Sequence, residues 1–372
     1  MTEGGKLMTR GPGAPDYIRK LPLYIPGKPI DEVRREVGIT DEIIKLASNE
    51  NPLGTSPKAL EAIRAALQDL NRYPDGGGFY LRRAVAERRG VAFDQVILGN
   101  GSTEIIEMLA KAYLTDGDEA VLSEQSFVMY PIAVASVHGK PVMVPATQKR
   151  CHDVEAMAQA VTPRTKLMYI ANPSNPTGTY ITRDEMDRLF ERLDDRVLVV
   201  IDQAYQEYVD QPDYPDTLAD LKAGRSVIVL RTFSKIYGLA GLRLGYGVTS
   251  PDVVETLNHV RSPFNTSNLA QAAGLAALDD TEWTERCRAE NTHELRFLQS
   301  ELKRRQVRFT PSVTNFVLVE FQLDVKKLFV DFQKRGVIVR PVGGPGLTNC
   351  VRVSVGTRRE NERFLAALDA LV

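Results

Sequence analysis

The sequence predicts an α/β protein whose large domain is built on a mostly parallel sheet of seven strands flanked by helices. One observation behind this prediction is a series of short apolar runs in the middle of the chain, which lack the polar alternation of half-exposed strands. The other is that amphipathic stretches, such as residues 102–114 and 183–193, lie between several of these runs. Strands and helices that alternate along a chain favour a parallel sheet covered by helices.

Each expected strand of the large sheet is one apolar run. In chain order these runs are residues 96–98, 120–122, 142–144, 167–170, 197–201, 227–230 and 244–248. The pattern changes after Pro251, where helical patterns come first and three further apolar runs follow. These later segments are residues 271–278 and 282–305 for the helices and 316–319, 337–339 and 351–353 for the strands. They predict a second, smaller α+β domain.

The chain therefore divides into four expected segments. They are a disordered tail (1–16), an N-terminal arm that forms part of the small domain (17–45), the large domain (46–250) and the small C-terminal domain (251–372). A length of 372 residues with 43% hydrophobic residues is sufficient for two buried cores.

Charge and composition exclude several classes of protein. A net charge of −1 argues against a nucleic-acid-binding or membrane-surface protein, because both favour a basic excess. No apolar run reaches the ~20 residues that span a bilayer, and the N-terminus lacks the apolar centre of a signal peptide. Cys151, Cys287 and Cys350 have no close spacing, which excludes a CxxC metal or redox motif and fits a reducing cytoplasm. We expect a cytoplasmic protein without a metal site.

The residues that follow the strands are the first place to look for chemistry, because ligands bind at the carboxyl ends of parallel strands. The run at 96–98 is followed by Gly-Asn-Gly-Ser-Thr-Glu, in which Ser102 or Thr103 can cap a helix whose free N–H groups bind phosphate. An ordinary capped helix explains the same pattern. A dinucleotide fingerprint is not met, because Glu104 stands where the third glycine belongs.

Two further strands end in polar side chains. The run at 167–170 is followed by the sequence Asn-Pro-Ser-Asn-Pro-Thr-Gly at 172–178, whose proline bonds can aim Asn175 at a ligand, although a plain turn fits as well. Asp202 directly follows the run at 197–201 and is costly to bury without a positive partner such as a pyridinium nitrogen. A helix cap is the alternative role for Asp202.

Lys235 is the candidate nucleophile. It follows the buried run at 227–230, after two hydroxyl residues, and a second cation, Arg243, comes soon after within a glycine-rich segment. A desolvated lysine near another cation has a lowered pKa and reacts with aldehydes. A phosphate cradle, a buried carboxylate, an aimed amide, the tyrosine at 205 and this lysine are together what pyridoxal phosphate requires.

At this point the chain resembles the fold-type-I pyridoxal-phosphate-dependent aminotransferases, and most closely their histidinol-phosphate branch. The resemblance runs from about residue 21 to 371, and the segment Arg-Thr-Phe-Ser-Lys-Ile-Tyr-Gly-Leu-Ala-Gly-Leu-Arg at 231–243 is highly specific to the family. The segments Asn-Glu-Asn-Pro-Leu-Gly at 49–54 and Tyr-Pro-Asp at 73–75 point to the histidinol-phosphate branch.

The resemblance implies roles for individual residues. Lys235 would form the Schiff base and carry the proton, Asp202 would keep the pyridine nitrogen protonated, and Asn175 and Tyr205 would bind the phenolic oxygen of the cofactor. The other residues implied to contact the cofactor, through its phosphate or its ring, are Ser102, Thr103, Phe127, Thr232, Ser234 and Arg243.

The resemblance also implies a shared site and a substrate. Tyr73 would reach the cofactor phosphate of a neighbouring subunit, which implies a homodimer with shared active sites. Tyr24, Arg340 and Arg352 would meet the substrate phosphate, and Arg352 would clamp the α-carboxylate of glutamate by a bidentate pair. The implied reaction is a ping-pong transamination in histidine biosynthesis, from L-histidinol phosphate and 2-oxoglutarate to imidazole-acetol phosphate and glutamate.

The sequence leaves the physiological amino donor open. An aromatic or broad-range aminotransferase would use Arg352 and the same apolar wall, whereas a phosphothreonine decarboxylase would need no keto acceptor. A cofactor-binding module without catalysis is a further alternative. The choice depends on Arg340, because a second cation suits a phosphate better than a phenyl ring. The conformation of the glycine-rich loop that follows, at 341–349, cannot be read from the sequence.

Overall fold

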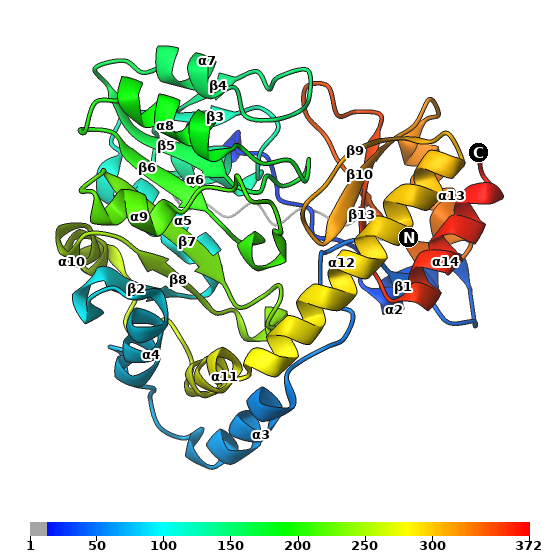
Figure 1. The fold of residues 1–372 in the computed structure, drawn as a ribbon, viewed down its shortest axis with the longest axis horizontal. Coiled ribbons are helices and arrows are strands. Elements are labelled where there is room, and N and C mark those ends of the chain that lie inside the picture. The colour runs from blue at the N-terminus through cyan, green and yellow to red at the C-terminus, as the bar shows by residue number, and fades with distance from the viewer. Residues whose placement is uncertain (1–12) are drawn as a thin grey trace.

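The computed structural model describes residues 13–372, which form a larger and a smaller lobe joined by one long helix, α12 (Thr281–Arg304) (Figure 1). The tail expected at 1–16 lies, up to residue 12, outside the described residues. No helix in the described part of the chain is long and apolar enough to cross a membrane.

The larger lobe contains the seven-stranded sheet that the sequence predicts. Its strands are β2 (Val96–Gly99), β3 (Glu119–Ser123), β4 (Lys140–Val144), β5 (Thr165–Ala171), β6 (Leu198–Asp202), β7 (Val227–Thr232) and β8 (Gly245–Val248). They lie in the order β2-β8-β7-β6-β5-β3-β4, and only β8 runs antiparallel to its neighbours. The predicted fold class, a mostly parallel sheet of seven strands with helices around it, is confirmed.

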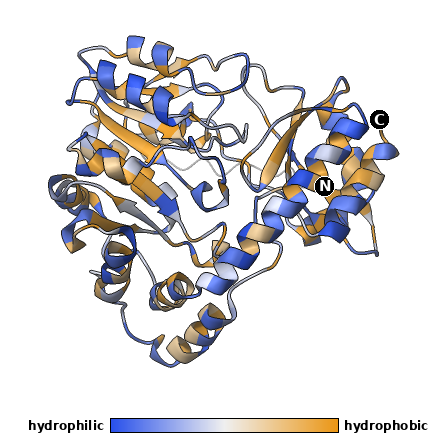
Figure 2. Cartoon of the chain, viewed as in Figure 1, coloured by the Kyte–Doolittle hydropathy of each residue, from blue (hydrophilic) through white to orange (hydrophobic). Residues whose placement is uncertain are grey.

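Helices cover both faces of this sheet. They are α5 (Gly101–Tyr113), α6 (Met129–Ser136), α7 (Val154–Gln159), α8 (Arg183–Arg192), α9 (Thr217–Lys222) and α10 (Pro251–Val260). Alternate residues of a strand enter opposite cores: Val199 packs on the side of α7, α8 and α9, and Val200 packs on the side of α5, α6 and α10. The central strands β5, β6 and β7 are mainly apolar because most of their residues are buried on both faces, as the hydropathy colouring shows (Figure 2).

Three more helices extend the larger lobe at the lower edge of Figure 1: α3 (Pro57–Ala66), α4 (Phe79–Arg89) and α11 (Asn268–Asp279). Short 3₁₀ turns lie at η1 (Leu67–Asp69), η2 (Phe93–Gln95), η3 (Gln206–Tyr208) and η4 (Ala240–Leu242). Helix α11 packs between α3 and α4, and buried alanines such as Ala270 and Ala273 allow the close approach.

The smaller lobe has its own sheet and core. Strands β9 (Arg308–Thr310), β10 (Phe316–Glu320), β12 (Arg340–Pro341) and β13 (Cys350–Ser354) form an antiparallel sheet in the order β12-β13-β10-β9. Helices α13 (Val325–Gln333) and α14 (Arg358–Asp369) pack against it around Phe332 and Phe364.

Most of the N-terminal segment joins the smaller lobe. The first helix, α1 (Asp16–Arg19), instead contacts α6 of the larger lobe, whereas α2 (Ile30–Val37) and β1 (Ile44–Lys45) pack on the smaller lobe. Strand β1 pairs in parallel with β11 (Val337–Ile338), so this lobe is built from both ends of the chain. The predicted domain boundaries stay a prediction. Because α10 and α11, which follow residue 250, pack against α3, α4 and α5, we propose that the small domain begins within α12.

Candidate active site

A cavity of about 590 Å³ opens at the carboxyl ends of β5, β6 and β7, between the two lobes. Nearly all of the site residues expected from the sequence line this one cavity: Tyr24, Ser102, Thr103, Phe127, Asn175, Asp202, Tyr205, Thr232, Ser234, Lys235, Arg243, Arg340 and Arg352. Residues from widely separated parts of the chain are therefore brought together where the topology of a parallel sheet places a ligand. Tyr73 is the exception.

Lys235 lies three residues beyond β7 and is half-buried on the cavity wall. Its Nζ donates a hydrogen bond to the carbonyl oxygen of Ser48 at 3.2 Å. Loss of solvation lowers the pKa of Lys235 to about 7, and the positive charges of Arg352 and Arg243 act in the same direction. A large share of the amine is therefore neutral near pH 7, which is the form that attacks an aldehyde.

Asp202 is the last residue of β6, and its side chain is buried. Its Oδ2 accepts a hydrogen bond from the hydroxyl of Tyr130 at 2.9 Å, and its Oδ1 accepts one from the backbone N–H of Ala204 at 3.1 Å. Burial raises the pKa of this carboxyl, and the two hydrogen bonds oppose that rise. A carboxylate held in this way is a suitable partner for a cationic ring nitrogen.

Tyr130 is a cavity residue that the sequence reasoning missed. It lies on α6, its side chain is completely buried, and its ring stacks on Tyr169 with 5.0 Å between centroids. Its edge also meets the ring of Phe127, the residue expected to stack on the cofactor, at 5.6 Å. A buried tyrosine hydroxyl needs a hydrogen-bond partner, but the burial of Tyr130 and its contact with Asp202 are evident only in the folded chain.

The expected phosphate end is formed where α5 begins, directly after β2. Ser102 and Thr103 lie in the first turn of this helix, whose N-terminal N–H groups and dipole favour an anion. The guanidinium of Arg243 lies beside them and donates to Ser234 Oγ at 3.3 Å. Thr232 Oγ1 accepts from the backbone N–H of Ser234 at 3.1 Å and so supports the same loop.

Two glycines create the space around this phosphate end. A Cβ on Gly101 would lie 2.5 Å from Arg243 Nη2, and a Cβ on Gly245 would lie 2.5 Å from the backbone nitrogen of Ser102. Because glycine has no Cβ, the guanidinium of Arg243 and strand β8 can both approach the start of α5 closely. Helix N–H groups, hydroxyls and a guanidinium that converge on one cradle fit the phosphate of the pyridoxal phosphate expected from the sequence.

Arg352 and Asn175 meet across the boundary between the lobes. Arg352 comes from β13, and its Nη1 donates to Asn175 Oδ1 at 2.6 Å while its Nη2 donates to the carbonyl oxygen of Ala47 at 2.8 Å. Its Nε is buried and has no partner among the described residues. The Asn175 oxygen is occupied by Arg352, so its Nδ2 remains to donate to a ligand.

Arg340 and Tyr24 lie at the mouth of the cavity. Arg340 Nη2 donates to the carbonyl oxygen of Ile25 at 2.6 Å, and its Cζ lies 5.9 Å from the centre of the Tyr24 ring. Tyr24 is half exposed. The site therefore contains two guanidinium groups at its substrate end, one on β12 and one on β13.

Tyr73 does not line the cavity of its own chain. Its side chain is 83% exposed, and its ring stacks on Phe264 with 4.6 Å between centroids. The role expected for Tyr73 requires a second copy of the chain, which the structure does not contain, and it stays a prediction, as do the roles of the other site residues.

Comparisons with known proteins agree with this geometry. The family model "Aminotransferase class I and II" matches residues 41–368. A histidinol-phosphate aminotransferase 2 of Pseudomonas fluorescens is 47% identical over 94% of this chain and 95% of its own, and the histidinol-phosphate aminotransferase of Moorella thermoacetica is 45% identical over 96% and 92%.

A solved structure is also similar. The histidinol-phosphate aminotransferase of Sinorhizobium meliloti, in complex with pyridoxal-5'-phosphate, superposes with a TM-score of 0.87 at 27% identity and covers 96% of this chain and 98% of its own. The family model spans well over half of the chain, and each of the two sequence relatives is at least 45% identical over nearly its whole length. The chain therefore belongs to the class I and II aminotransferases.

Proposed function

We propose that the protein transfers the amino group of L-histidinol phosphate to 2-oxoglutarate, giving imidazole-acetol phosphate and glutamate in histidine biosynthesis. The observation that carries this proposal is the pair of guanidinium groups, Arg340 and Arg352, at the substrate end of the cavity that holds Lys235. A phosphate monoester carries up to two negative charges and suits two cations, whereas an aromatic amino acid offers one carboxylate. Relatives with 45–47% identity are named for this reaction.

The cofactor is pyridoxal phosphate, which when bound supplies a ring that accepts the electrons left behind when the α-proton departs. Lys235 holds the cofactor through its amine and moves the α-proton at Nζ, because its lowered pKa leaves the amine neutral near pH 7. Asp202 binds the ring nitrogen and favours its protonated form. Asn175 and Tyr205 orient the phenolic oxygen, and the start of α5 with Arg243 anchors the phosphate.

The two substrates use the same cations in turn. Arg352 binds the α-carboxylate of 2-oxoglutarate or glutamate through a bidentate pair, and the phosphate of histidinol phosphate meets Arg340, Arg352 and the Tyr24 hydroxyl. Because one site accepts both substrates in sequence, the kinetics are ping-pong.

The test is a half-reaction in a spectrophotometer. The yellow, cofactor-loaded enzyme is mixed separately with histidinol phosphate, phenylalanine, phosphothreonine and glutamate, without an amino acceptor. Bleaching by histidinol phosphate that is much faster than bleaching by phenylalanine supports the proposal. Comparable or faster bleaching by phenylalanine assigns the enzyme to aromatic substrates, and release of carbon dioxide from phosphothreonine assigns it to decarboxylation.

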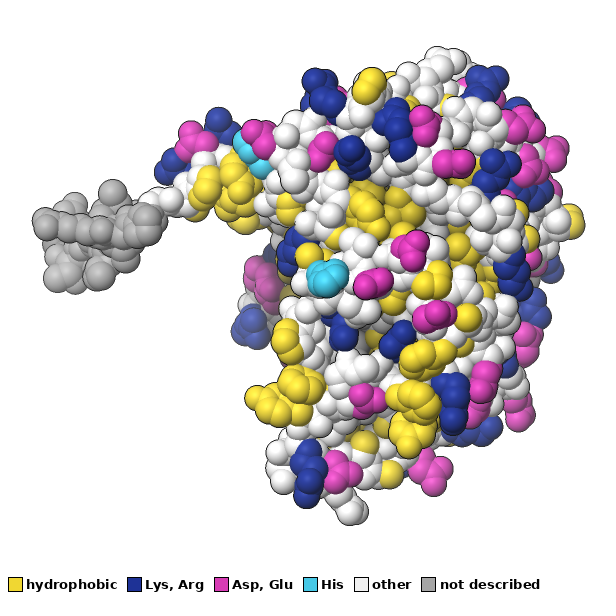
Figure 3. Space-filling view, turned by 90° about the vertical axis from the view of Figure 1, so that its left-hand side faces the viewer, with side chains coloured by type: hydrophobic (Ala, Val, Ile, Leu, Met, Phe, Trp, Pro, Cys, Tyr) yellow, Lys and Arg dark blue, Asp and Glu magenta, His cyan; other side chains and the backbone are white. Residues whose placement is uncertain are grey.

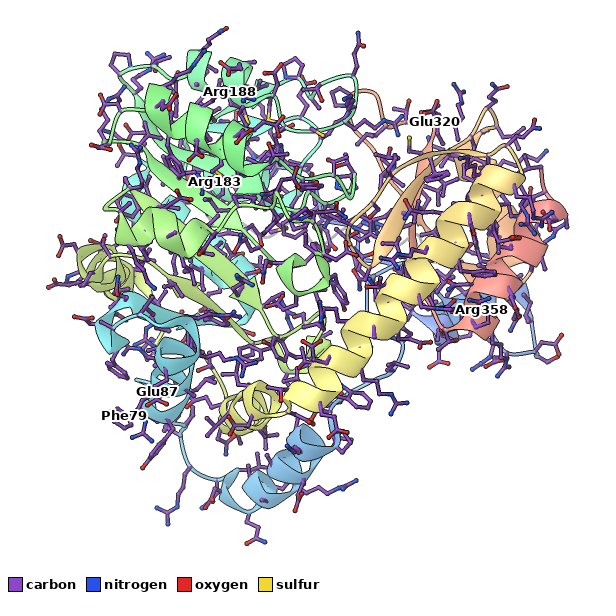
Figure 4. The ribbon with its side chains drawn as sticks, in the orientation of Figure 1. Phe79, Glu87, Arg183, Arg188, Glu320 and Arg358 are labelled. Carbon is purple, nitrogen blue, oxygen red and sulfur yellow. The ribbon has the colours of Figure 1, made fainter. Side chains whose placement is uncertain are left out.

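We further propose a homodimer with shared active sites. Tyr73 is part of a group of exposed apolar residues on and around α3 and α4, which also includes Leu60, Leu67, Leu70, Phe79, Tyr80, Phe93 and Phe264. Figure 4 places Phe79 on α4 at the margin of the larger lobe. Exposed aromatic groups of this density are typical of interfaces. Figure 3 views the molecule from the left-hand side of Figure 1 and shows hydrophobic side chains gathered in groups among charged ones on that face.

We place the reaction in the cytoplasm. Cys151, Cys287 and Cys350 are all free, and Cys287 and Cys350 are buried. Unpaired thiols of this kind fit a reducing compartment, where amino-acid biosynthesis takes place.

A further inference from the structure

Asn49 lines the cavity and connects the two lobes. It lies in the segment after β1, is 1% exposed, and has a φ of +54°, a conformation that asparagine adopts more readily than most residues. Its backbone N–H donates to Ser354 Oγ at 2.8 Å, and its carbonyl oxygen accepts from Asn315 Nδ2 at 3.0 Å. Its side chain makes two further hydrogen bonds, one to Ser354 and one to Tyr205 at 3.0 Å each.

The hydrogen bonds of Ser354 determine which way the Asn49 amide points. Ser354 Oγ accepts from the Asn49 backbone N–H, so its own proton is donated to Asn49 Oδ1. The amide nitrogen of Asn49 must then face the hydroxyl of Tyr205. With the amide reversed, Ser354 would receive two donors and its own proton would lack this acceptor. Ser354 is only 3% exposed, so an unpaired hydroxyl there would be costly.

This orientation has a consequence for Tyr205. A phenolic hydroxyl has one proton, and because its oxygen accepts from Asn49 Nδ2, that proton is free for another acceptor. Tyr205 lines the cavity. We propose that Asn49 is a positioning residue that turns the hydroxyl proton of Tyr205 into the cavity, where Tyr205 donates it to the phenolic oxygen of pyridoxal phosphate. This inference rests on the proposed placement of the cofactor beside Tyr205.

The charged groups around Tyr205 are compatible with this role. Arg352, Asp202 and Tyr24 face it, and the Nζ of Lys235 lies 5.5 Å from the centre of its ring. Burial raises the pKa of Tyr205 above its ordinary value, even though Arg352 and the hydrogen bond from Asn49 oppose the rise. The hydroxyl therefore keeps its proton and remains a donor over the working pH range.

The experiment is a pH titration of the colour of the cofactor-loaded enzyme, read by absorbance without substrate. A donor to the phenolic oxygen stabilises its anionic form, so loss of the donor moves the titration midpoint to higher pH. Tyr205→Phe removes the donor. Asn49→Asp has the same shape as asparagine but accepts the Tyr205 proton, and it is expected to raise the midpoint by roughly one pH unit, a tenfold change in proton affinity. Asn51→Asp, which places a new carboxylate nearby without touching Tyr205, is the control.

The double variant Asn49→Asp/Tyr205→Phe separates an effect on the proton from a plain charge effect. If Asn49 acts through Tyr205, the double variant has the midpoint of Tyr205→Phe alone. An Asn49→Asp shift that persists in full in the Tyr205→Phe background, or no shift at all, overturns the inference. An unchanged midpoint in Tyr205→Phe itself would instead reject the proposed cofactor placement.

Ser354→Ala provides an independent test if Asn49→Asp folds poorly. It leaves Asn49 in place but removes the hydroxyl that orients its amide. We expect an upward shift of the midpoint that again disappears in the Tyr205→Phe background. A Ser354→Ala midpoint equal to that of the unmodified enzyme would contradict the argument from the amide orientation.

Discussion

The pKa of Lys235 is low because its amine is poorly solvated and lies near positive charges. Loss of solvation, with help from Arg352 and Arg243, lowers its pKa to about 7 from an ordinary value of 10.5. In the folded, cofactor-free protein the amine is therefore mostly neutral above pH 7 and mostly charged below it.

This protonation predicts how cofactor uptake depends on pH. When cofactor-free enzyme is mixed with pyridoxal phosphate, the rate at which the yellow complex forms should fall about tenfold per pH unit below pH 7 and level off above it. The measurement is stopped-flow absorbance between pH 5.5 and 9.5. A rate that continues to rise through pH 9 would mean that the lysine keeps its ordinary pKa.

Tyr130 is the second residue for which the structure predicts the effect of a substitution. In Tyr130→Phe the buried carboxyl of Asp202 loses one of its two hydrogen-bond donors, so its pKa should rise further and it should bind a cationic ring nitrogen less well. A hydrogen bond to a charged group contributes about 1.5–3 kcal/mol, so kcat should fall by roughly 10- to 100-fold.

Tyr169→Phe is the matched control for this change. Tyr169 is also completely buried and stacks on Tyr130, but among residues 13–372 its hydroxyl meets only the carbonyl oxygen of Ile106, at 3.4 Å. Its kcat should stay within a few-fold of the unmodified enzyme. Equal losses in the two variants would show that Tyr130 acts through packing rather than through Asp202.

The sequence predicts site residues well where position along the chain is informative. Asp202 stands directly after an apolar run and Lys235 stands a few residues after one, so the rule that ligands bind at strand ends selects them. Tyr130 and Asn49 escape that rule because their importance comes from partners 72 and 156 residues away. Contacts over such separations exist only in the folded chain.

At the scale of elements, the contact between β8 and the start of α5 shapes the phosphate end. A Cβ on Gly245 would lie 2.5 Å from Ser102 N, 2.7 Å from the Gly101 carbonyl carbon and 2.9 Å from the Arg231 carbonyl oxygen. All three are backbone atoms, which cannot move aside without displacing the strand or the helix.

Gly245→Ala should therefore weaken cofactor binding at least about tenfold, because the first turn of α5 is pushed away from Arg243, and it should lower the melting temperature. Gly241→Ala is the control, because nothing lies within 4 Å of the position that its Cβ would occupy. The measurements are the dissociation constant for pyridoxal phosphate and the melting temperature of each variant. Unchanged affinity in Gly245→Ala would mean that the cradle adapts.

Strand positions are predictable from apolar runs, but strand direction and partners are not. The run at 244–248 reads like its neighbours, yet β8 is antiparallel, because a run buried on both faces contains no information about direction. The strand expected at 337–339 is shortened to β11, which pairs with β1, and a separate strand that the apolar run does not include, β12, begins at Arg340 and pairs with β13. Pairing partners are set by tertiary packing, which a run of three apolar residues does not specify.

At the scale of the whole molecule, shared active sites predict complementation between subunits. In a mixed dimer of Lys235→Ala and Tyr73→Ala subunits, one site carries both changes and the other carries neither. Mixing the two weakly active proteins under conditions of subunit exchange should restore up to about half the activity of the native dimer, in proportion to the fraction of mixed dimers.

The control is to mix Lys235→Ala with a Lys235→Ala/Tyr73→Ala subunit, which leaves no intact site in any dimer. Activity and dimer composition would be followed together, the latter by native mass spectrometry. Mixed dimers that form without any gain in activity would show that Tyr73 serves its own chain or no site at all.

The pairing of β1 with β11 sets an order of events during synthesis. About 290 residues separate the two strands, so at 5–20 residues per second the ribosome needs roughly 15–60 s to deliver the partner of β1. All seven strands of the large sheet have been made long before then, and the sheet can assemble first. Arg352 arrives later still, on β13. Until β13 has been made, a growing chain therefore carries Lys235 without the Arg352 charge that helps to lower the pKa of its amine.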